Sequence, residues 1–274
     1  MPSRLRYSLL ICLSAGFAAH AFAADKDSAL PPAVSDPHFQ LAPGYLKQTN
    51  LPDSLQLLGP PPTVGSPSLA RDEQAGQATL PLRGTARWEL ARTDADLSFP
   101  QPAKNFSCAM GLQIDATTTP HLYTLMQRIL TDAGLSTYGV KDKYQRTRPF
   151  VIHNEGTCRP DQEALLRNDG SYPSGHTAAG WAWALVLAEI HPQRANTLLS
   201  RGISFGQSRV ICNAHWQSDV DAGRIMGAAT VARLHADPTF LADLELARKE
   251  VIAATAQHPA MECSSETAAL SGTP

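Results

Sequence analysis

Asp169-Gly-Ser-Tyr-Pro-Ser-Gly-His-Thr177 is the stretch that decides how this chain folds and where its chemistry lies. It is a turn rich in glycine and proline that leads directly into an apolar helix, predicted over 178–190. The N-terminus of a helix presents unpaired backbone N–H groups and partial positive charge, so it attracts anions. Ser174 and His176 add a hydroxyl and a titratable ring there. The predicted helix is much shorter than the roughly 20 residues that span a bilayer, so we interpret it as a buried core helix.

Two flanking segments carry complementary side chains. Upstream, Lys141 and Arg148 are seven residues apart, two helical turns, so a helix would project both from one face. Downstream, Arg209 is followed by His215 and Asp219, and the last two stand at i, i+4 spacing, which places them on one face of a helix. We expect the three segments to meet around one phosphate group.

The residue types in these segments suit a phosphate monoester, which carries close to two negative charges at neutral pH. Arginine offers a planar fork that matches phosphate oxygens, and lysine offers a point charge. Glycine in the turn lets the backbone approach the anion closely. The predicted phosphate-binding residues are Lys141, Arg148, Ser174, Gly175, His176 and Arg209.

The two histidines predict catalysis. A carboxylate bonded to one ring nitrogen of His215 fixes the tautomer and leaves the other nitrogen free to attack phosphorus, and Asp219 is the predicted partner. His176 would then protonate the leaving alkoxide as a general acid. The predicted reaction is in-line phosphoryl transfer through a phosphohistidine, which water hydrolyses, with an acidic pH optimum because His176 must be protonated. Three nearby cations disfavour a metal centre at this place, so no metal and no cofactor is expected.

The motif set resembles a known family. Its parts are Lys141-x6-Arg148-Pro149, Pro173-Ser-Gly-His176 and Ser208-Arg209-x5-His215-x3-Asp219. This order is similar to the PAP2 superfamily, which includes bacterial acid phosphatases, membrane lipid phosphatases and vanadium haloperoxidases. The flanks of the motifs, over about residues 138–240, look like those of class A secreted bacterial non-specific acid phosphatases. The resemblance implies an all-α, single-domain helical bundle, a metal-independent mechanism, inhibition by vanadate or phosphate, and hydrolysis of nucleotides and of sugar and aryl phosphates.

Other functions are compatible with the same anion site. A vanadate-dependent haloperoxidase would use His215 as the vanadate ligand, although the class A flanks argue against it. A periplasmic phosphate-binding protein would need the cations but has no use for His176 beside a His215–Asp219 pair. A membrane lipid phosphatase is disfavoured by the lack of spanning helices. Phosphotransfer to alcohols would accompany hydrolysis if acceptors other than water intercept the phosphohistidine.

Length and charge narrow the class of protein. The 274 residues suffice for one large domain or two small ones, with 43% hydrophobic and 18% charged residues. The formal net charge of −2 gives no signal for nucleic-acid binding. The expected partners are small phosphomonoesters, and neither a membrane nor a nucleic acid is among them. The sequence leaves a homo-oligomer, a dimer or larger, open.

The chain divides into four predicted segments. Residues 1–23 have the basic start, the short apolar run and the Ala-x-Ala end of a cleaved secretory signal, which predicts export to a bacterial periplasm. Residues 24–65 are rich in proline and predict an arm or loop with little regular structure. Residues 66–258 form the predicted phosphatase domain, and 259–274 a flexible tail.

Apolar periodicity predicts helices and no strands in the domain. Besides the helix over 178–190, the expected helical segments are 68–79, 85–95, 105–114, a helix from 119 that ends at Gly134 or Gly139, 140–147, 195–211, 216–236 and 239–256. A long loop is expected over 150–172. Glycine and alanine at 222, 223 and 227–229 predict close contact between helices.

Four cysteines remain once the signal is removed, an even number that suits an oxidising compartment. Three pairings are open, and free buried thiols are the alternative. We favour Cys158–Cys212, because each residue lies near a motif segment and a bridge would tie the two together. A zinc site is disfavoured, since no C-x-x-C pair is present.

Overall fold

The computed structural model describes residues 41–257 and 261–271, so the predicted signal over 1–23 lies outside the described part. Within these ranges the regular structure is helical and contains no strand, so the predicted all-α class is confirmed. The longer helices are α2 (Pro67–Thr79), α3 (Ala86–Asp94), α4 (Gln101–Met110), α5 (Pro120–Leu135), α6 (Tyr138–Tyr144), α9 (Gly175–Ile190), α10 (Ala195–Ile211), α11 (Gln217–Leu234) and α12 (Pro238–Gln257). None of the helices in these ranges combines the length and apolar character of a bilayer-crossing segment.

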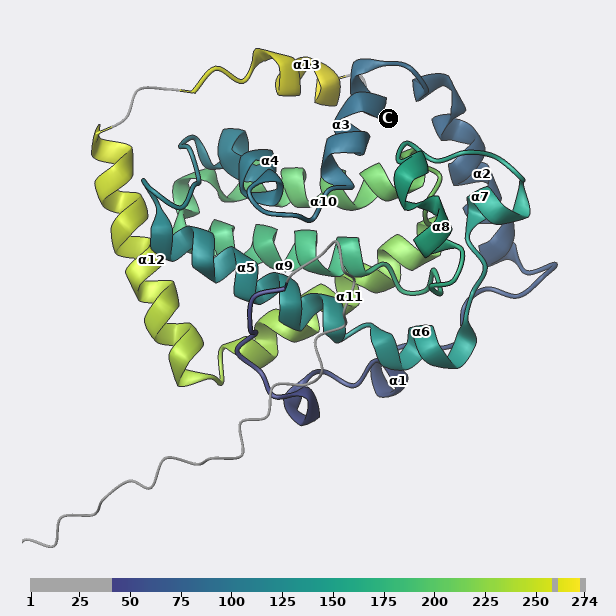
Figure 1. The fold of residues 1–274 in the computed structure, drawn as a ribbon, viewed down its shortest axis with the longest axis horizontal. Helices are drawn as coiled ribbons and strands as arrows, with labels where there is room; N and C mark the ends of the chain where they lie inside the picture. The colour runs from purple at the N-terminus through teal and green to yellow at the C-terminus, as the bar shows by residue number, and fades with distance from the viewer. Residues whose placement is uncertain (1–40, 258–260, 272–274) are drawn as a thin grey trace, which may run out of the picture. The chain divides into compact units, whose positions relative to one another are not determined.

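Helix α9 lies at the centre of the core, as the apolar run after the turn predicts. It packs against α5, α10, α11 and α12, and Figure 1 shows it between α10 and α11. Trp183 on α9 is fully buried, and its indole N–H donates to the carbonyl of Met126 on α5 over 2.8 Å. Because α9 is surrounded, its N-terminal turn is held in place by several other elements.

Small residues on α11 let that helix approach α9 closely, as predicted. A Cβ atom on Gly223 would lie 2.6 Å from the carbonyl oxygen of Ser174, and one on Gly227 would lie 2.5 Å from that of Ala178. Real Cβ atoms do not come so close to backbone, so neither position accepts a side chain without a shift of one helix. The contact fixes α11 against the turn that begins α9.

Among the segments expected in the domain, 105–114, 140–147 and 150–172 differ from the structure. Helix α4 covers 101–110 rather than 105–114, because a proline at 102 suits its first turn and Gly111, with φ of 75°, ends it. The segment 150–172 is not a plain loop, since it contains α7 (Pro149–Ile152), α8 (Glu163–Leu166) and a 3₁₀ turn. These short elements have no long apolar periodicity, so pattern alone does not find them.

Residues 41–65 of the proline-rich arm are extended apart from the 3₁₀ turn Gln48–Asn50 and α1 (Ser54–Leu57). They follow the surface of the helical core and are bonded to it at several points. Near the start of this stretch the backbone N–H groups of Tyr45 and Leu46 donate to the Asp132 carboxylate on α5 over 2.8 and 3.2 Å. A Cβ atom on Gly44 would lie 2.1 Å from the same carboxylate, so a side chain at this position would displace Asp132 from its contacts with the arm.

The C-terminal segment, predicted as a flexible tail, contains regular structure in its described part, residues 261–271. Residues 264–271 form helix α13 (Ser264–Ser271), which packs near α3, and Figure 1 shows it beside that helix. A disulfide joins Cys263, just before α13, to Cys108 on α4. The Glu266 side chain reaches the guanidinium of the buried Arg201 at 3.4 Å. Serine and threonine in this segment suggest a loose end, but the disulfide and the ion pair are long-range contacts that local composition does not reveal.

Candidate active site

Lys141 and Arg148 converge, but not on one helix face. Helix α6 ends at Tyr144, and Gln145 takes up a left-handed conformation with φ of 43°. Arg148 lies beyond this break, as the N-cap residue of α7. The expectation of a continuous helix over 140–147 is therefore wrong, and the two cations meet because the chain turns back on itself.

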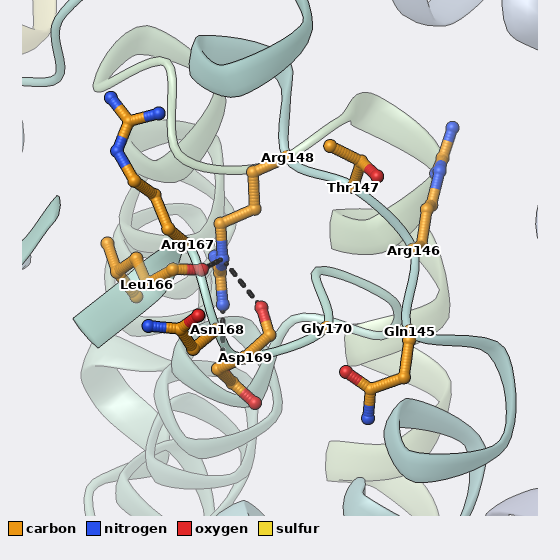
Figure 2. A pocket seen from close by; sticks show the side chains of 9 residues that line it. All are labelled: Gln145, Arg146, Thr147, Arg148, Leu166, Arg167, Asn168, Asp169 and Gly170. Carbon is orange, nitrogen blue, oxygen red and sulfur yellow. Dashed lines mark hydrogen bonds and ion pairs between the residues drawn. The ribbon is translucent and has the colours of Figure 1, made fainter. Parts of the chain in front are cut away.

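Asp169 joins these two cations and was given no role in the sequence analysis. One of its carboxylate oxygens lies 2.8 Å from Nη2 of Arg148 and 3.3 Å from Nζ of Lys141. Nε of Arg148 also donates to the carbonyls of Leu166 and Asp169, and Figure 2 shows these bonds. Lys141 donates in addition to the carbonyl of Gly170. The Asp169–Gly170 backbone thus positions both cations.

His215 and Asp219 form the predicted pair. Nδ1 of His215 lies 3.3 Å from Oδ2 of Asp219, and Nε2 lies 3.0 Å from Nη1 of Arg148. A guanidinium can only donate, so Nε2 accepts and the ring proton is on Nδ1, facing the carboxylate. This is the tautomer in which Nε2 has a lone pair for attack.

The position of His215 relative to Arg209 is set by the backbone hydrogen bonds that end α10. The backbone carbonyl of Arg209 accepts from the N–H groups of Ala214 and His215 over 3.1 and 3.2 Å. The disulfide Cys158–Cys212, the pairing favoured above, is present in the structure at this helix end. The backbone N–H of Cys158 also donates to the carbonyl of Cys212. The loop that carries His215 is therefore held by both backbone and covalent bonds.

Arg209 is a fully buried cation without a hydrogen-bond partner. Its exposed fraction is 0%, and none of Nε, Nη1 and Nη2 has an acceptor among the described residues. Burial, together with the neighbouring Arg148, lowers its pKa to about 9. Buried charges are normally paired, because the desolvated ion costs several kcal/mol otherwise. A guanidinium held in this way is suited to an anion that supplies the acceptors.

The turn at the start of α9 presents a hydroxyl and a second histidine. Ser174 is the N-cap residue, and its Oγ accepts from the backbone N–H of Thr177 over 3.2 Å, while its own N–H donates to the Asp219 carbonyl over 2.9 Å. Nε2 of His176 lies 3.1 Å from the carbonyl of Ala95. A carbonyl can only accept, so Nε2 carries the proton and Nδ1 carries one only when the ring is charged.

Burial and the cations together control the charges of the site. Burial lowers the pKa of His215 well below its usual value, and Arg148 and Lys141 act in the same direction. Burial also lowers the pKa of Lys141 to about 8, so this ammonium is charged at acidic and neutral pH. For Asp219 burial raises the pKa, and Arg146 at 2.6 Å opposes that effect. The result is a neutral imidazole with several cations close to it, an arrangement that favours the binding of anions.

Three further charged groups, Arg146, Asp72 and Asp94, support the site and have no signal in the sequence. Arg146 pairs with Asp219 at 2.6 Å and with Asp72 on α2 at 2.8 Å. On α10, the Ser208 hydroxyl next to Arg209 donates to Asp94 over 2.6 Å. These partners come from helices far away in the sequence, so only the folded chain reveals them.

A cavity of about 270 Å³ adjoins Arg148 and Asp169. Its walls are Gln145–Arg148 and Leu166–Gly170, and Figure 2 shows their side chains around it. Most of these groups are polar or cationic. The cavity offers hydrogen-bonding groups beside the cationic cluster and no large apolar wall.

Comparisons with known proteins agree with this geometry. The PAP2 superfamily model matches residues 121–241, which include all of the predicted site. The chain is 44% identical over 239 residues to the non-specific acid phosphatase of Providencia stuartii, covering 87% of this chain and 96% of that protein. It is 47% identical over 195 residues to the non-specific acid phosphatase of Salmonella typhimurium, covering 71% and 78% of the two chains. An acid phosphatase of Zymomonas mobilis is 45% identical over 199 residues, or 73% and 75%. This chain therefore belongs to the PAP2 superfamily, as a phosphatase of the class A-type bacterial acid phosphatases.

Proposed function

We propose that the protein hydrolyses phosphate monoesters, including nucleotides and sugar and aryl phosphates, through a phosphohistidine on His215. The observation that carries the proposal is the buried Arg209, whose guanidinium lacks acceptors among the described residues, in the same cluster as an imidazole whose unprotonated nitrogen is Nε2. A phosphoryl group would supply those acceptors and present phosphorus to that lone pair. Arg148 and Lys141 would stabilise the equatorial oxygens as charge develops on them.

The reaction has two steps. Nε2 of His215 attacks phosphorus while the ester P–O bond breaks, and His176 gives a proton to the leaving oxygen. A water molecule then attacks the phosphohistidine and loses a proton to His176, which frees Nε2 and releases phosphate. In both steps the Asp219 carboxylate accepts a hydrogen bond from Nδ1–H of His215 and stabilises the positive charge on the ring. An alcohol that replaces water in the second step would make the protein a phosphotransferase.

Three other properties belong to the proposal. Vanadate and phosphate are expected inhibitors, because both are tetrahedral oxyanions that fit the same cations. The Ser174 hydroxyl and the N–H groups at Gly175 and His176 are the expected donors at the helix end. The pattern of residues 1–23 supports secretion into the periplasm.

Replacing the nucleophile tests the proposal. His215→Ala is expected to lower kcat on p-nitrophenyl phosphate at least about a thousandfold, since no other group can form the intermediate. Inorganic phosphate should still protect the variant against thermal unfolding, because the cations are kept. His235→Ala is the matched control, as this histidine pairs with Glu189 on the surface. All assays contain EDTA, and substantial turnover by the His215 variant would contradict the nucleophile assignment.

A further inference from the structure

The arm, residues 41–65, is bonded to two of the three motif segments. The hydroxyl of Ser54 accepts from the backbone N–H of Val140, and the hydroxyl of Tyr172 donates to the carbonyl of Gly59. We propose that the arm positions the phosphate-binding residues, with Ser54 and Tyr172 as the positioning residues at its two contacts. The inference rests on the proposed function, since it assumes that Lys141 and the turn before α9 bind phosphate.

Ser54 caps α6 from a distant part of the chain. The local N-cap residue, Thr137, makes no side-chain cap and donates instead to the carbonyl of Gly134 over 2.7 Å. Ser54 Oγ supplies the missing acceptor to Val140 at 3.1 Å, in the first turn of the helix. Ser54 is 2% exposed, so water does not replace it easily. The next residue after Val140 is Lys141, so this cap fixes the backbone from which the lysine extends.

Tyr172 links the arm to the turn that begins α9. Its hydroxyl donates to the Gly59 carbonyl over 3.2 Å, and its side chain is 7% exposed. Two residues later the chain reaches Ser174, the N-cap of α9. A displacement of the tyrosine would therefore move the hydroxyl and the amide groups at the helix end.

The rest of the arm is anchored well away from these contacts. Tyr45 and Leu46 bind Asp132, and the carbonyl of Asn50 accepts from Nε of Arg233 over 3.1 Å. The approach at α6 is close as well, because a Cβ atom on Gly139 would lie 3.0 Å from Ser54 Oγ. Because these anchors fix the arm, Ser54 is held at a defined position. The contacts of the arm can therefore fix the positions of Lys141 and of the turn before α9.

The first test removes the remote cap. Ser54→Ala is expected to raise the inhibition constant of inorganic phosphate against p-nitrophenyl phosphate about three- to tenfold, the range that loss of one cap represents. The melting temperature should fall by about 2–4 °C. Asp237→Ala is the matched control, because Asp237 accepts from two backbone N–H groups at the start of α12, away from the motif segments. It should lose similar stability and keep the inhibition constant.

The second test uses a pair of tyrosines and does not depend on the first. Tyr172→Phe removes only the contact with Gly59 and should also raise the inhibition constant of phosphate. Tyr45→Phe is its control, since the Tyr45 hydroxyl donates to Asp243 at the other end of the arm. That variant should bind phosphate as the parent protein does. If Ser54→Ala does not fold, the tyrosine pair decides the question.

The outcomes separate this inference from the proposed function. Lys141→Ala should weaken phosphate inhibition more than either arm variant does. If the inhibition constant of Lys141→Ala equals that of the parent protein, the proposed phosphate site itself is wrong. If Lys141→Ala weakens inhibition while Ser54→Ala and Tyr172→Phe do so no more than their controls, the arm only stabilises the fold. In that case the positioning role is wrong and the proposed site remains.

Discussion

Arg209 is the residue that most strongly supports the proposed anion site. It occupies a fully buried position, yet no described residue accepts a hydrogen bond from its guanidinium. Arg201, eight residues earlier on the same helix, is equally buried but pairs with Asp94 and Glu266. Arg201 is therefore a structural cation, because carboxylates of the fold pair with it. The donors of Arg209 have no such partners among the described residues and are available to a ligand.

Replacing these two arginines should have opposite effects on stability. Arg209→Met removes a buried charge without partners, so we expect it to stabilise the protein by about 1–3 kcal/mol and to abolish the rise in melting temperature that phosphate produces. Arg201→Met leaves two carboxylates without a cation and should destabilise by about 3–5 kcal/mol. Thermal unfolding with and without phosphate measures both. A destabilised Arg209 variant that still responds to phosphate would contradict the assigned role.

His176 must gain a proton before it can act as an acid. Burial lowers its pKa well below the usual value, and Arg209 adds to the effect. A bound phosphate dianion would offset the positive charge of Arg209 and so raise the pKa of His176. The substrate itself would therefore favour the protonated acid, and the proton would reside on Nδ1, because Nε2 already donates to Ala95.

The pH dependence of the kinetics tests this coupling. Activity is lost as pH rises through the pKa of the acid, and this pKa is higher in the complex than in the free protein. The alkaline limb of kcat should therefore lie at higher pH than that of kcat/KM. Profiles with p-nitrophenyl phosphate and with an alkyl phosphate measure the difference. His176→Ala should remove that limb and affect the alkyl ester more, because its leaving group needs the proton. Coincident limbs would contradict the argument.

At the scale of elements, the sequence predicts those parts of the site whose geometry is local. Ser174 caps α9 as its position before an apolar helix indicates. His215 and Asp219 meet as predicted but not on one helix face, because His215 precedes Trp216, the N-cap residue of α11, while Asp219 lies in the first turn of that helix. The expectation that Lys141 and Arg148 share a helix face fails, since Gln145 breaks α6 and no periodicity marks that position.

The supporting charges of the site were not predictable from pattern. Asp169 lies within the deciding stretch, but an aspartate before a glycine is an ordinary turn residue. Asp72 and Arg146 come from segments 74 residues apart, and their ion pair exists only after α2 packs near α11. Such contacts depend on the tertiary arrangement of helices, which hydrophobic spacing does not specify.

At the scale of the whole molecule, the arm is part of the folded structure rather than a loose leader. The composition of residues 24–65 predicts little regular structure. In the described part, residues 41–65, the regular structure is the 3₁₀ turn Gln48–Asn50 and the short α1, and composition does not predict the attachment to α5. The anchor at Asp132 is sensitive to pH. Burial raises the pKa of Asp132 to about 6, against the opposing effect of the N–H groups of Tyr45 and Leu46.

Asp132→Asn should change the pH dependence of stability. The folded protein holds the proton of Asp132 up to about pH 6, whereas the unfolded chain releases it near pH 3.9. The parent protein therefore loses stability relative to the variant as pH rises from about 4 to 6, by at most about 3 kcal/mol. Melting temperatures of both proteins between pH 4 and 8 measure this gap. The difference in melting temperature, variant minus parent, should increase with pH. A difference that is constant with pH, or that increases as the pH falls, would contradict the assignment.

Trapping the phosphorylated protein would identify the nucleophile. The protein is mixed with excess p-nitrophenyl phosphate, quenched within milliseconds in alkali, where phosphohistidine survives, and its peptides are sequenced by mass spectrometry. We expect one phosphoryl group on the imidazole of His215. The phosphorylated fraction should be larger in His176→Ala, because hydrolysis of the intermediate is slower in that variant. A phosphoryl group on any other residue, or a burst of p-nitrophenol with no label on His215, would contradict it.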